Sequence, residues 1–375
     1  MAVLFRGIIF VLAFLLIAVT VVLRVLYGGG NNYPDLTTPP LLGEDRLEVA
    51  VRSAEPVGNV AVSRDGRIFF TIHPESRPDH HRLVEWRNNA AIPYPDEPSQ
   101  KTHFQTPLGI VIDQKNRLWT IDHGFHGLQK ARLSAFDLDS SKLVHDFIFP
   151  DRIARPGSFL QDLQVDSSGE TVYIADASIF RRNPAIIVYD VKKKTARRVL
   201  ESDPSVFPQD WVIRNPIREM VFLGGLITLK PGVDGIALDQ NDEWLYYAPV
   251  THDSLFRVRT ADLRNPQWTT QELSSRVEPF GRKPLNDGIL AGKDGSIYIT
   301  DVEHGSVMRL GTDKKLQTVI RSSRIRWADS LSMGPDGYIY LADSALPHLI
   351  LQSKSHMRAQ APYYIFRFKS GSGEP

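Results

Sequence analysis

The stretch Met333-Gly-Pro-Asp-Gly-Tyr-Ile-Tyr340 decides the fold, because its plan occurs six times along the chain. The plan begins with an apolar residue, continues through a polar turn rich in Asp, Asn and Gly, and ends with a β-branched or Leu residue followed by an aromatic. Turn residues of this kind accept positive φ, and the β-branched–aromatic pair suits a pleated, half-buried strand. Each copy therefore predicts a β-hairpin. The other five copies are Val62-Ser-Arg-Asp-Gly-Arg-Ile-Phe69, Ile112-Asp-Gln-Lys-Asn-Arg-Leu-Trp119, Val165-Asp-Ser-Ser-Gly-Glu-Thr-Val-Tyr173, Leu238-Asp-Gln-Asn-Asp-Glu-Trp-Leu-Tyr246 and Ala291-Gly-Lys-Asp-Gly-Ser-Ile-Tyr298.

The spacing of the six copies predicts the architecture. They start at residues 62, 112, 165, 238, 291 and 333, at intervals of 50, 53, 73, 53 and 42 residues. All-β repeats of about 40–50 residues are typical of propeller blades. We therefore predict an all-β, six-bladed β-propeller over residues 46–370, followed by a flexible tail at 371–375. The long interval holds an insertion at about 202–232, which we expect either to cover the channel or to pack on a blade's flank.

A propeller must close its ring, often by placing a strand from one end of the chain in the blade formed by the other. Leu47-Glu-Val-Ala-Val51 alternates like an edge strand, and Tyr363-Tyr-Ile-Phe-Arg-Phe368 is the last clear strand. We predict that these two segments meet in one blade. The alternative is that residues 46–52 are only linker.

Composition excludes several classes of protein. The formal net charge of +1 argues against a nucleic-acid-binding surface, which needs a concentrated basic face. The absence of cysteine excludes disulfides and thiolate chemistry. There is no Gly-x-Ser-x-Gly elbow, phosphate loop or dinucleotide fingerprint, so no nucleotide or organic cofactor is expected and serine hydrolysis is disfavoured.

The amino terminus predicts export. Gly7 to Leu23 is a run of 17 uncharged residues between Arg6 and Arg24, close to the shortest span for a hydrocarbon core of about 30 Å. A cleaved signal peptide is the competing interpretation, but its apolar region is usually shorter. We expect residues 1–27 to be a transmembrane or signal anchor and 28–45 a linker. The propeller is then membrane-anchored and extracytoplasmic, or secreted if the segment is cleaved.

Propeller geometry brings polar residues together. In each blade the residues before the innermost strand and after the second strand converge on one mouth of the central channel. The residues before the first strands are Asn59, Gln161-Asp162, Asp234, Asn286-Asp287 and Asp329. Those after the second strands are His73, Asp122-His123, Asp176, His252-Asp253, Asp301 with Glu303-His304, and Asp343.

This ring supports two kinds of chemistry. Many oxygen ligands could hold a divalent cation, with Ca²⁺ the most suitable. Facing Asp and His side chains could also act as general acid and base. Any single Asp could instead hydrogen-bond nearby backbone. As a set, however, they would crowd negative charge around one axis, which needs compensation.

Several phrases together resemble the Yellow/major royal jelly protein family. The phrases are Leu108-Gly-Ile-Val-Ile-Asp-Gln-Lys-Asn-Arg-Leu-Trp-Thr-Ile-Asp122, Phe159-Leu-Gln-Asp-Leu-Gln-Val-Asp166, Tyr173-Ile-Ala-Asp-Ala-Ser178, Gly235-Ile-Ala-Leu-Asp239, Trp327-Ala-Asp-Ser-Leu331 and Pro362-Tyr-Tyr-Ile-Phe-Arg-Phe368. The resemblance implies a six-bladed propeller, usually secreted, with a small-molecule pocket at the channel mouth. Its members range from dopachrome-converting proteins of tautomerase type to binders of biogenic amines and storage proteins, so fold alone does not settle activity.

The chain also departs from that family and partly resembles another. It lacks the cysteines common in insect members and carries an apparent anchor. Asp234 and Asn286-Asp287-Gly288 are similar to phrases of the senescence-marker/gluconolactonase propellers, where they hold a divalent metal. By that resemblance Asp234 and Asn286 would be metal ligands, and Asp162 and Asp329 would complete the shell or act as bases.

We therefore expect an exported, membrane-tethered propeller that binds a small polar or aromatic molecule at the channel mouth. The sequence leaves open whether it is an enzyme; if it is, we expect proton transfer of the tautomerase type. The expected catalytic residues are Asp162, Asp329 and His123, and the expected ligand-binding residues are Asn59, Asp287, His252 and His304. The alternatives are a metal-dependent lactonase using Asp234 and Asn286, and a non-catalytic scaffold that binds another exported protein.

Overall fold

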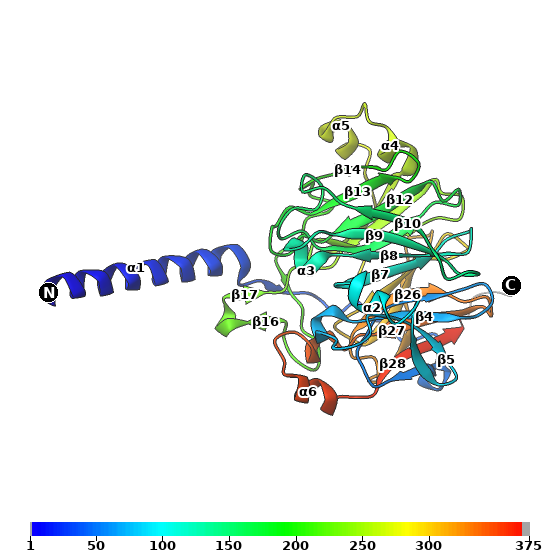
Figure 1. Ribbon diagram of the computed structural model, residues 1–375, viewed down its shortest axis with the longest axis horizontal. Helices are drawn as coiled ribbons and strands as arrows, with labels where there is room; N and C mark the ends of the chain where they lie inside the picture. The colour runs from blue at the N-terminus through cyan, green and yellow to red at the C-terminus, as the bar shows by residue number, and fades with distance from the viewer. Residues whose placement is uncertain (1, 370–375) are drawn as a thin grey trace.

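The computed structural model describes residues 2–369, so the predicted tail at 371–375 lies outside the described residues. Six four-stranded antiparallel sheets surround a central channel, and a long helix precedes them (Figure 1). The predicted six-bladed β-propeller is confirmed. The first three blades are β3 Val57–Val62, β4 Ile68–Ile72, β5 Leu83–Arg87 and β6 Ala90–Pro93; β7 Pro107–Ile112, β8 Arg117–Asp122, β9 Arg132–Asp137 and β10 Leu143–Ile148; and β11 Leu160–Val165, β12 Thr171–Asp176, β13 Ala185–Asp190 and β14 Thr195–Val199.

The remaining three blades complete the ring. They are β18 Val233–Leu238, β19 Trp244–Pro249, β20 Ser254–Arg259 and β21 Glu278–Arg282; β22 Ile289–Ala291, β23 Ile297–Asp301, β24 Ser306–Leu310 and β25 Leu316–Arg321; and β26 Ala328–Met333, β27 Tyr338–Asp343, β28 Tyr363–Lys369 and β2 Glu48–Ser53. Short helices lie in the connections: α2 Ser99–Thr102, α3 Gly124–Gly127, α4 Thr260–Arg264, α5 Thr270–Ser274 and α6 Lys354–Ala359, with 3₁₀ turns at Glu44–Arg46, Pro74–Ser76, Leu223–Gly225 and Leu346–His348.

The repeated phrases form the hairpins between the two innermost strands of each blade. Every one of these six turns contains a residue with positive φ, and each is a Gly, Asn or Asp. They are Gly66, Asn116, Gly169, Asp242, Gly295 and Gly337, with φ between 55° and 83°. These residue types tolerate the left-handed region, which is why the phrase recurs at each turn.

The predicted ring closure is present. β2 pairs antiparallel with β28, joining Val51 to Ile365 and Ser53 to Tyr363. The first strand of the propeller is thus the outermost strand of its last blade. Val51, Tyr363 and Ile365 are buried in one apolar cluster with residues of blade 1, so closure also seals the core between the first and last blades.

The innermost strands share an irregularity at the start. In β3, β7, β11, β18 and β26 the pairing register shifts within the first few residues, between Val57/Val60, Pro107/Ile110, Leu160/Leu163, Val233/Gly235 and Ala328/Leu331. A bulge of this kind bends a strand and re-aims its side chains. Asn59, Asp162, Asp234 and Asp329 therefore lie within the first residues of their strands. The sequence had placed them ahead of the strands.

The amino-terminal helix α1, Ala2–Tyr27, stands out from one face of the disc (Figure 1). Its segment Phe5–Tyr27 is long and apolar enough to cross a membrane, with a mean hydropathy of 3.0 over its most apolar 18 residues, which the propeller does not cover. Such a helix is compatible with a membrane anchor or a signal sequence. The loop helix α3 and the insertion strands lie on the same side of the molecule as α1 (Figure 1).

The insertion and the linker are attached to the propeller. The insertion forms β15 Trp211–Val212 and the small hairpin of β16 Val221–Phe222 with β17 Ile227–Thr228. The linker strand β1 Asn31–Asn32 pairs parallel with β15. Farther along, the backbone N–H groups of Leu41 and Leu42 donate to Thr318 and Val319 of β25. Linker, insertion and blade 5 therefore form one continuous surface.

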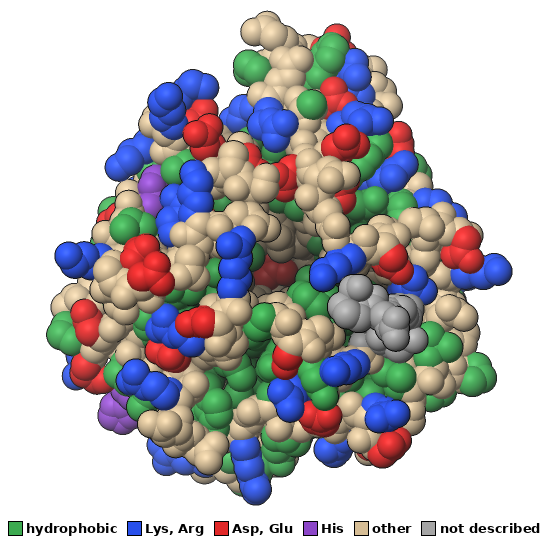
Figure 2. Space-filling model, turned by 90° about the vertical axis from the view of Figure 1, so that its right-hand side faces the viewer, with side chains coloured by type: hydrophobic (Ala, Val, Ile, Leu, Met, Phe, Trp, Pro, Cys, Tyr) green, Lys and Arg blue, Asp and Glu red, His purple; other side chains and the backbone are tan. Residues whose placement is uncertain are grey.

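The face opposite α1 has a different character. Figure 2 shows it with Lys, Arg, Asp and Glu side chains spread across its surface and a hollow at its centre. The features that follow belong to the face that carries α1.

Candidate functional site

A cavity of about 740 Å³ opens on the α1 face, at the mouth of the central channel. Its floor includes Gln161, Asp234, Asp287 and Trp327. Its walls come from the loops that follow the second strand of several blades, from the insertion and from the end of α1: Leu26, Tyr27, His73, Glu75, His126, Ile179, Phe180, Val250, Leu223, Leu229, Leu346 and Ile350. The insertion therefore contributes a wall of the cavity mouth.

Four aspartates from consecutive blades lie around the channel axis below this cavity. They are Asp162, Asp234, Asp287 and Asp329, carried by blades 3, 4, 5 and 6. Asp234, Asp287 and Asp329 are buried, and Asp162 is partly accessible. The bulged starts of β11, β18 and β26 turn Asp162, Asp234 and Asp329 toward the axis, and Asp287 lies just ahead of β22, which has no bulge. Crowding four carboxyl groups in a low-dielectric site makes full ionisation unfavourable.

Close contact between inner strands depends on two glycines. A Cβ on Gly235 would lie 2.5 Å from the carbonyl oxygen of Asp287, and a Cβ on Gly288 would lie 2.4 Å from that of Asp329. Neither distance is compatible with any side chain. The backbones that carry Asp234, Asp287 and Asp329 can approach one another only because positions 235 and 288 are glycine.

The pair Asp234–Asp287 is the central feature of the floor. Asp287 accepts hydrogen bonds from Trp327 Nε1 at 2.6 Å and from Gln161 Nε2 at 3.3 Å. Burial raises the pKa of Asp287 to about 6, against the lowering effect of hydrogen bonds from Trp327 and Asp234. Burial, and then the charge of Asp287, raises the pKa of Asp234 well above its usual value. Near neutral pH the pair therefore holds one proton, on Asp234.

The other two carboxyl groups are also biased toward the protonated form. Burial and then the charge of Asp287 raise the pKa of Asp162 to about 8, opposed by the 3.0 Å hydrogen bond from Asn59 Nδ2. Burial is again the first cause for Asp329, whose pKa lies well above its usual value, followed by Asp287 and Asp162. The carboxyl cluster therefore still binds protons near neutral pH.

A neutral histidine faces Asp329. His73 Nε2 lies 3.7 Å from Asp329 Oδ2. His73 Nδ1 accepts the backbone N–H of Glu75 at 3.1 Å, so the ring proton is on Nε2, which points toward the carboxyl group. Burial lowers the pKa of His73 to about 4. The contact is thus one between neutral groups at neutral pH.

A second histidine pair forms part of the cavity wall. His126 Nε2 and Glu75 Oε1 are 2.8 Å apart, and both residues line the cavity. His123 lies behind them, with its ring 4.7 Å from that of Phe159 and 4.9 Å from that of His126. Burial lowers the pKa of His123 well below its usual value. His123 is therefore a neutral, buried support for the wall, and His126 with Glu75 forms its polar surface.

The aspartates that follow the second strands have a structural role. Asp122 accepts the backbone N–H groups of Gln105, Thr106 and Gly124 at 2.6–3.0 Å. Asp176 and Asp343 do the same in their blades, and each also pairs with an arginine, Arg198 or Arg326, at 2.7 and 2.8 Å. These carboxylates fix the loops around the mouth.

Several buried polar atoms at the floor have no hydrogen-bond partner among the described residues. They include Asp234 Oδ1, Asn286 Oδ1 and Asp329 Oδ2. Hard oxygen atoms of this kind suit a divalent cation. Within residues 2–369, however, no group of three or more His, Asp or Glu side chains has the spacing of a metal site. The chemistry of these oxygen atoms therefore suits a divalent cation, whereas the spacing of the acidic side chains does not match a metal site.

The predicted site residues fall into two groups. Asn59, Asp162, Asp234, Asn286, Asp287 and Asp329 are brought together, and Asn286 Nδ2 donates to the backbone carbonyl of Asp287 at 2.8 Å. His252 and His304 are not among the residues that line the cavity. His252 Nδ1 accepts the N–H of Ser254 at 3.0 Å, and burial lowers its pKa to about 4.

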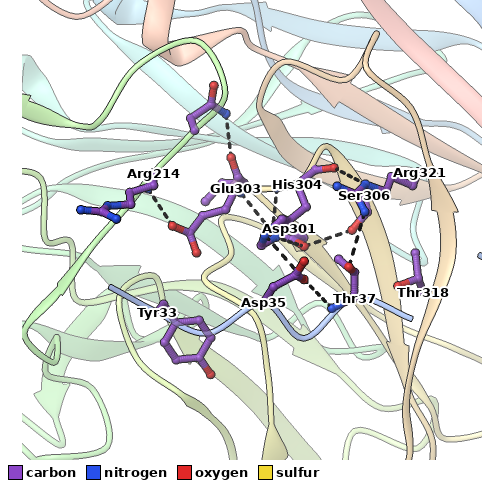
Figure 3. A network of polar contacts seen from close by, with 12 residues as sticks. Tyr33, Asp35, Thr37, Arg214, Asp301, Glu303, His304, Ser306, Thr318 and Arg321 are labelled. Atoms are coloured by element: carbon purple, nitrogen blue, oxygen red, sulfur yellow. Dashed lines mark hydrogen bonds and ion pairs between the residues drawn. The ribbon is translucent and has the colours of Figure 1, made fainter. Parts of the chain in front are cut away.

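His304 belongs to a polar network that holds the linker and the insertion to blade 5 (Figure 3). Its Nδ1 lies 2.9 Å from Asp301 Oδ2 and its Nε2 lies 3.5 Å from Asp35 Oδ1 of the linker. The hydrogen bond to Asp301 raises its pKa. Beside it, Glu303 accepts the backbone N–H of Arg214 at 2.7 Å, and burial raises the Glu303 pKa to about 7.

The site also contains two residues that the predicted ring did not include. Trp327, with the expected Gln161, orients Asp287, and Glu75 pairs with His126 at the wall. Trp327 lies two residues before a predicted aspartate in Trp327-Ala-Asp329, so adjacency was an available signal. Nothing in the sequence marks Glu75, which meets His126 only through the fold.

Comparison with known proteins agrees with this architecture. A family model described as Major royal jelly protein matches residues 105–366. Major royal jelly protein 3 of Apis mellifera is 25% identical over 236 residues, which are 60% of this chain and 42% of the relative. Major royal jelly protein 6 of the same species is 30% identical over 195 residues, 47% of this chain and 41% of the relative. The alignments span about two-fifths of these relatives.

Solved structures share the fold. A gluconolactonase from Xanthomonas campestris aligns with TM-score 0.53 and 12% identity, covering 92% of this chain and 98% of its own. The calcium-binding protein regucalcin from Agrobacterium tumefaciens aligns with TM-score 0.52 and 13% identity, covering 90% and 99%. At these identities the likeness shows the propeller architecture and nothing about activity.

Proposed function

The chain belongs to the major royal jelly protein family, and from this premise we propose that it binds a small molecule in the channel-mouth cavity and transfers a proton on it. The ligand would have an aromatic or apolar body and a polar or cationic end. The reaction would be an isomerisation of the tautomerase type. The proposal places the protein outside the cytoplasm, tethered by α1.

The observation that carries the proposal is the carboxyl pair Asp234–Asp287 at the cavity floor. One member is protonated near neutral pH, and the other has a pKa of about 6 and is mainly ionised. General acid–base catalysis works best with groups whose pKa lies near the working pH. A base and an acid thus stand side by side under one ligand.

The step balances without any further reactant. The Asp287 carboxylate would take a proton from an acidic C–H or N–H of the ligand, and Asp234 would give its proton to an electron-rich oxygen or carbon of the same molecule. The ligand is isomerised, and the pair regains its starting state when one proton moves from Asp287 to Asp234. Trp327 Nε1, 2.6 Å from Asp287, keeps that carboxylate oriented and ionised between cycles.

The rest of the cavity suits such a ligand. Phe159, Ile179, Phe180 and Trp327 offer apolar and aromatic surface around the floor. A cationic end would be favoured by the four carboxyl groups, because its charge relieves the cost of ionising them. The His126–Glu75 pair adds a polar contact on the wall.

Turnover of dopachrome by the full chain in detergent tests the proposal. We expect Asp287→Asn and Asp234→Asn each to lower the rate by about 10²–10⁴-fold, the usual contribution of a positioned acid or base. Asp313→Asn, at an exposed turn in blade 5, is the matched control and should keep the wild-type rate. Equal rates in all variants would contradict the proposal and leave a binding or scaffold protein.

A second candidate is metal-dependent hydrolysis of a lactone, which the unpartnered oxygens of Asp234, Asn286 and Asp329 favour. A divalent cation held there would polarise the lactone carbonyl and orient water. Calorimetric titration of the chelator-treated full chain with Ca²⁺ separates the two. Tight binding lost in Asn286→Ala would favour the hydrolase, and absence of heat would exclude Ca²⁺ at this site.

A further inference from the structure

We propose that the cavity mouth faces the surface of a lipid bilayer, and that its ligand is an amphiphile that enters from the lipid phase with its polar end first. The apolar body of this amphiphile would remain among the residues of the mouth while its head reaches the carboxyl groups of the floor. The identity of the ligand rests on the function proposed above, whereas the orientation of the face does not.

The first observation is that α1 is part of the cavity. Leu23, Val25, Leu26 and Tyr27, all in the last turns of the helix, line the opening. The Tyr27 hydroxyl donates to the carbonyl of Phe180 at 2.7 Å. The end of the apolar helix is thus attached to the rim of the cavity and does not hang away from it on a loose linker.

The length of α1 then sets the height of the cavity rim relative to the membrane. The apolar segment Phe5–Tyr27 has 23 residues, which at 1.5 Å per residue extend about 34 Å. A hydrocarbon core is about 30 Å thick, so a helix that spans it has its last turn within a few ångströms of the far boundary. Because that last turn forms the wall of the cavity, the cavity opens at the same level, in the interfacial region.

The rim itself is apolar and exposed. Leu128, Phe180, Leu223 and Leu351 are 79%, 54%, 61% and 70% exposed. They come from four separate connections, which follow β8, β12, β16 and β27, and three of them line the cavity. A single exposed apolar side chain is ordinary in a soluble protein, but several around one opening mark a binding surface.

Arginines border this surface at the helix end. Arg182 stands over the Tyr27 ring at 5.8 Å, whereas Lys230 Nζ, which donates to the carbonyl of Gly28 at 3.1 Å, is paired with Asp210. Arg24 lies one turn earlier on α1. Tyr side chains and Arg or Lys next to a spanning helix are typical of the membrane–water boundary, where they meet headgroups.

The chemistry of the cavity fits a ligand from that boundary. Amphiphiles in a bilayer keep their polar heads at the interfacial level, where the mouth lies. The passage from Leu26, Leu351 and Ile350 at the mouth to Asp234 and Asp287 at the floor runs from apolar to acidic. An amine-headed amphiphile would match this gradient at both ends, whereas a fully polar ligand would leave the mouth unmatched.

Site-specific fluorescence tests the orientation. The chain has no cysteine, so single-cysteine variants of the full chain can be labelled without background. Leu128→Cys and Leu351→Cys would carry an environment-sensitive dye in phosphatidylcholine vesicles that contain a minor fraction of phosphatidylglycerol. We expect a blue-shifted emission that nitroxide-labelled lipid quenches. Val144→Cys, on β10, replaces another exposed apolar side chain, 51% exposed, and is the control that should behave as in water. Mouth labels that match this control would overturn the orientation.

A second experiment tests whether the ligand is an amine-headed amphiphile. Binding of a long-chain alkylamine to the reconstituted full chain is compared with binding of its short-chain homologue. Each methylene buried in the mouth should tighten binding about fourfold, and Asp234→Asn should weaken both amines. Equal affinity for the two chain lengths would overturn entry from the lipid while leaving the small-molecule site in place. Absence of binding by either amine would contradict the proposed site as well.

Discussion

Aspartates at the channel mouth of this propeller have two opposite environments. Asp122, Asp176 and Asp343 accept several N–H groups and hold loops in place. Asp162, Asp234, Asp287 and Asp329 have few donors, burial raises the pKa of all four, and the charge of Asp287 raises the pKa of the other three further. The first set stabilises the fold. The second set lowers the stability of the folded chain, but it provides carboxyl groups that titrate near neutral pH.

Asp162 provides a test of this cost. Its pKa is about 8 in the folded chain and about 3.9 in the unfolded chain. A raised pKa gives stability that is fully present below pH 3.9 and is lost as the pH rises through 8. Asp162→Asn removes this loss and keeps an oxygen that can accept from Asn59. The melting temperature of the variant minus that of wild type should therefore rise between pH 4 and 8, while the same difference for Asp313→Asn stays flat. A flat difference for Asp162→Asn would contradict the raised pKa.

Individual residues also show how much of the site can be predicted from the sequence. The polar residues at the starts of the inner strands could be identified because five of the six blades repeat them, and these residues do converge on the axis. His304 could not be placed, because the linker and insertion that surround it are not part of the repeat. Glu75 could not be found either, because its partner His126 is 51 residues away in the next blade.

At the scale of the element, the inner strand is the unit that builds the site. Its bulge directs a polar side chain to the axis, and the glycines at 235 and 288 let neighbouring inner strands come close enough for those side chains to interact. The hairpin turn at the other end of the strand could be predicted from its Gly, Asn or Asp. The bulge could not, because a shift of register leaves no residue type that is reserved for it.

Gly288→Ala tests this role. The added Cβ would lie 2.4 Å from the backbone oxygen of Asp329, so the inner strands of blades 5 and 6 must separate. We expect the free energy of unfolding to fall by about 1–3 kcal/mol, as for overpacked cores. Gly43→Ala is the control, because its Cβ would meet only the movable side chain of Asp45. Denaturant unfolding measures both, and equal stabilities would show that the glycine is not needed for the approach.

At the scale of the whole molecule, the amino-terminal region has three roles. β2 closes the ring, the linker joins the insertion to blade 5, and the end of α1 completes the cavity mouth. The alternating pattern at residues 47–51 predicted the first role correctly. The other two depend on contacts with an irregular insertion, for which sequence periodicity offers no rule.

Two truncations separate ring closure from the other roles. A chain that starts at Leu47 keeps β2 and should unfold cooperatively in a thermal scan. A chain that starts at Ala54 lacks β2 and exposes the edge of β28, an unpaired strand that invites aggregation. We expect the shorter chain to lose its cooperative transition or to precipitate. Equal transitions in both chains would show that closure does not depend on β2.

The central claim is that the carboxyl cluster at the channel mouth binds the ligand. Calorimetry of tyramine binding to the full chain near pH 7, in two buffers of different ionisation enthalpy, measures the protons exchanged. A bound ammonium group should lower the pKa of its carboxyl neighbours, so we predict that binding releases protons and that Asp234→Asn weakens both the binding and the release. Binding without proton release, or binding that Asp234→Asn leaves unchanged, would contradict the account.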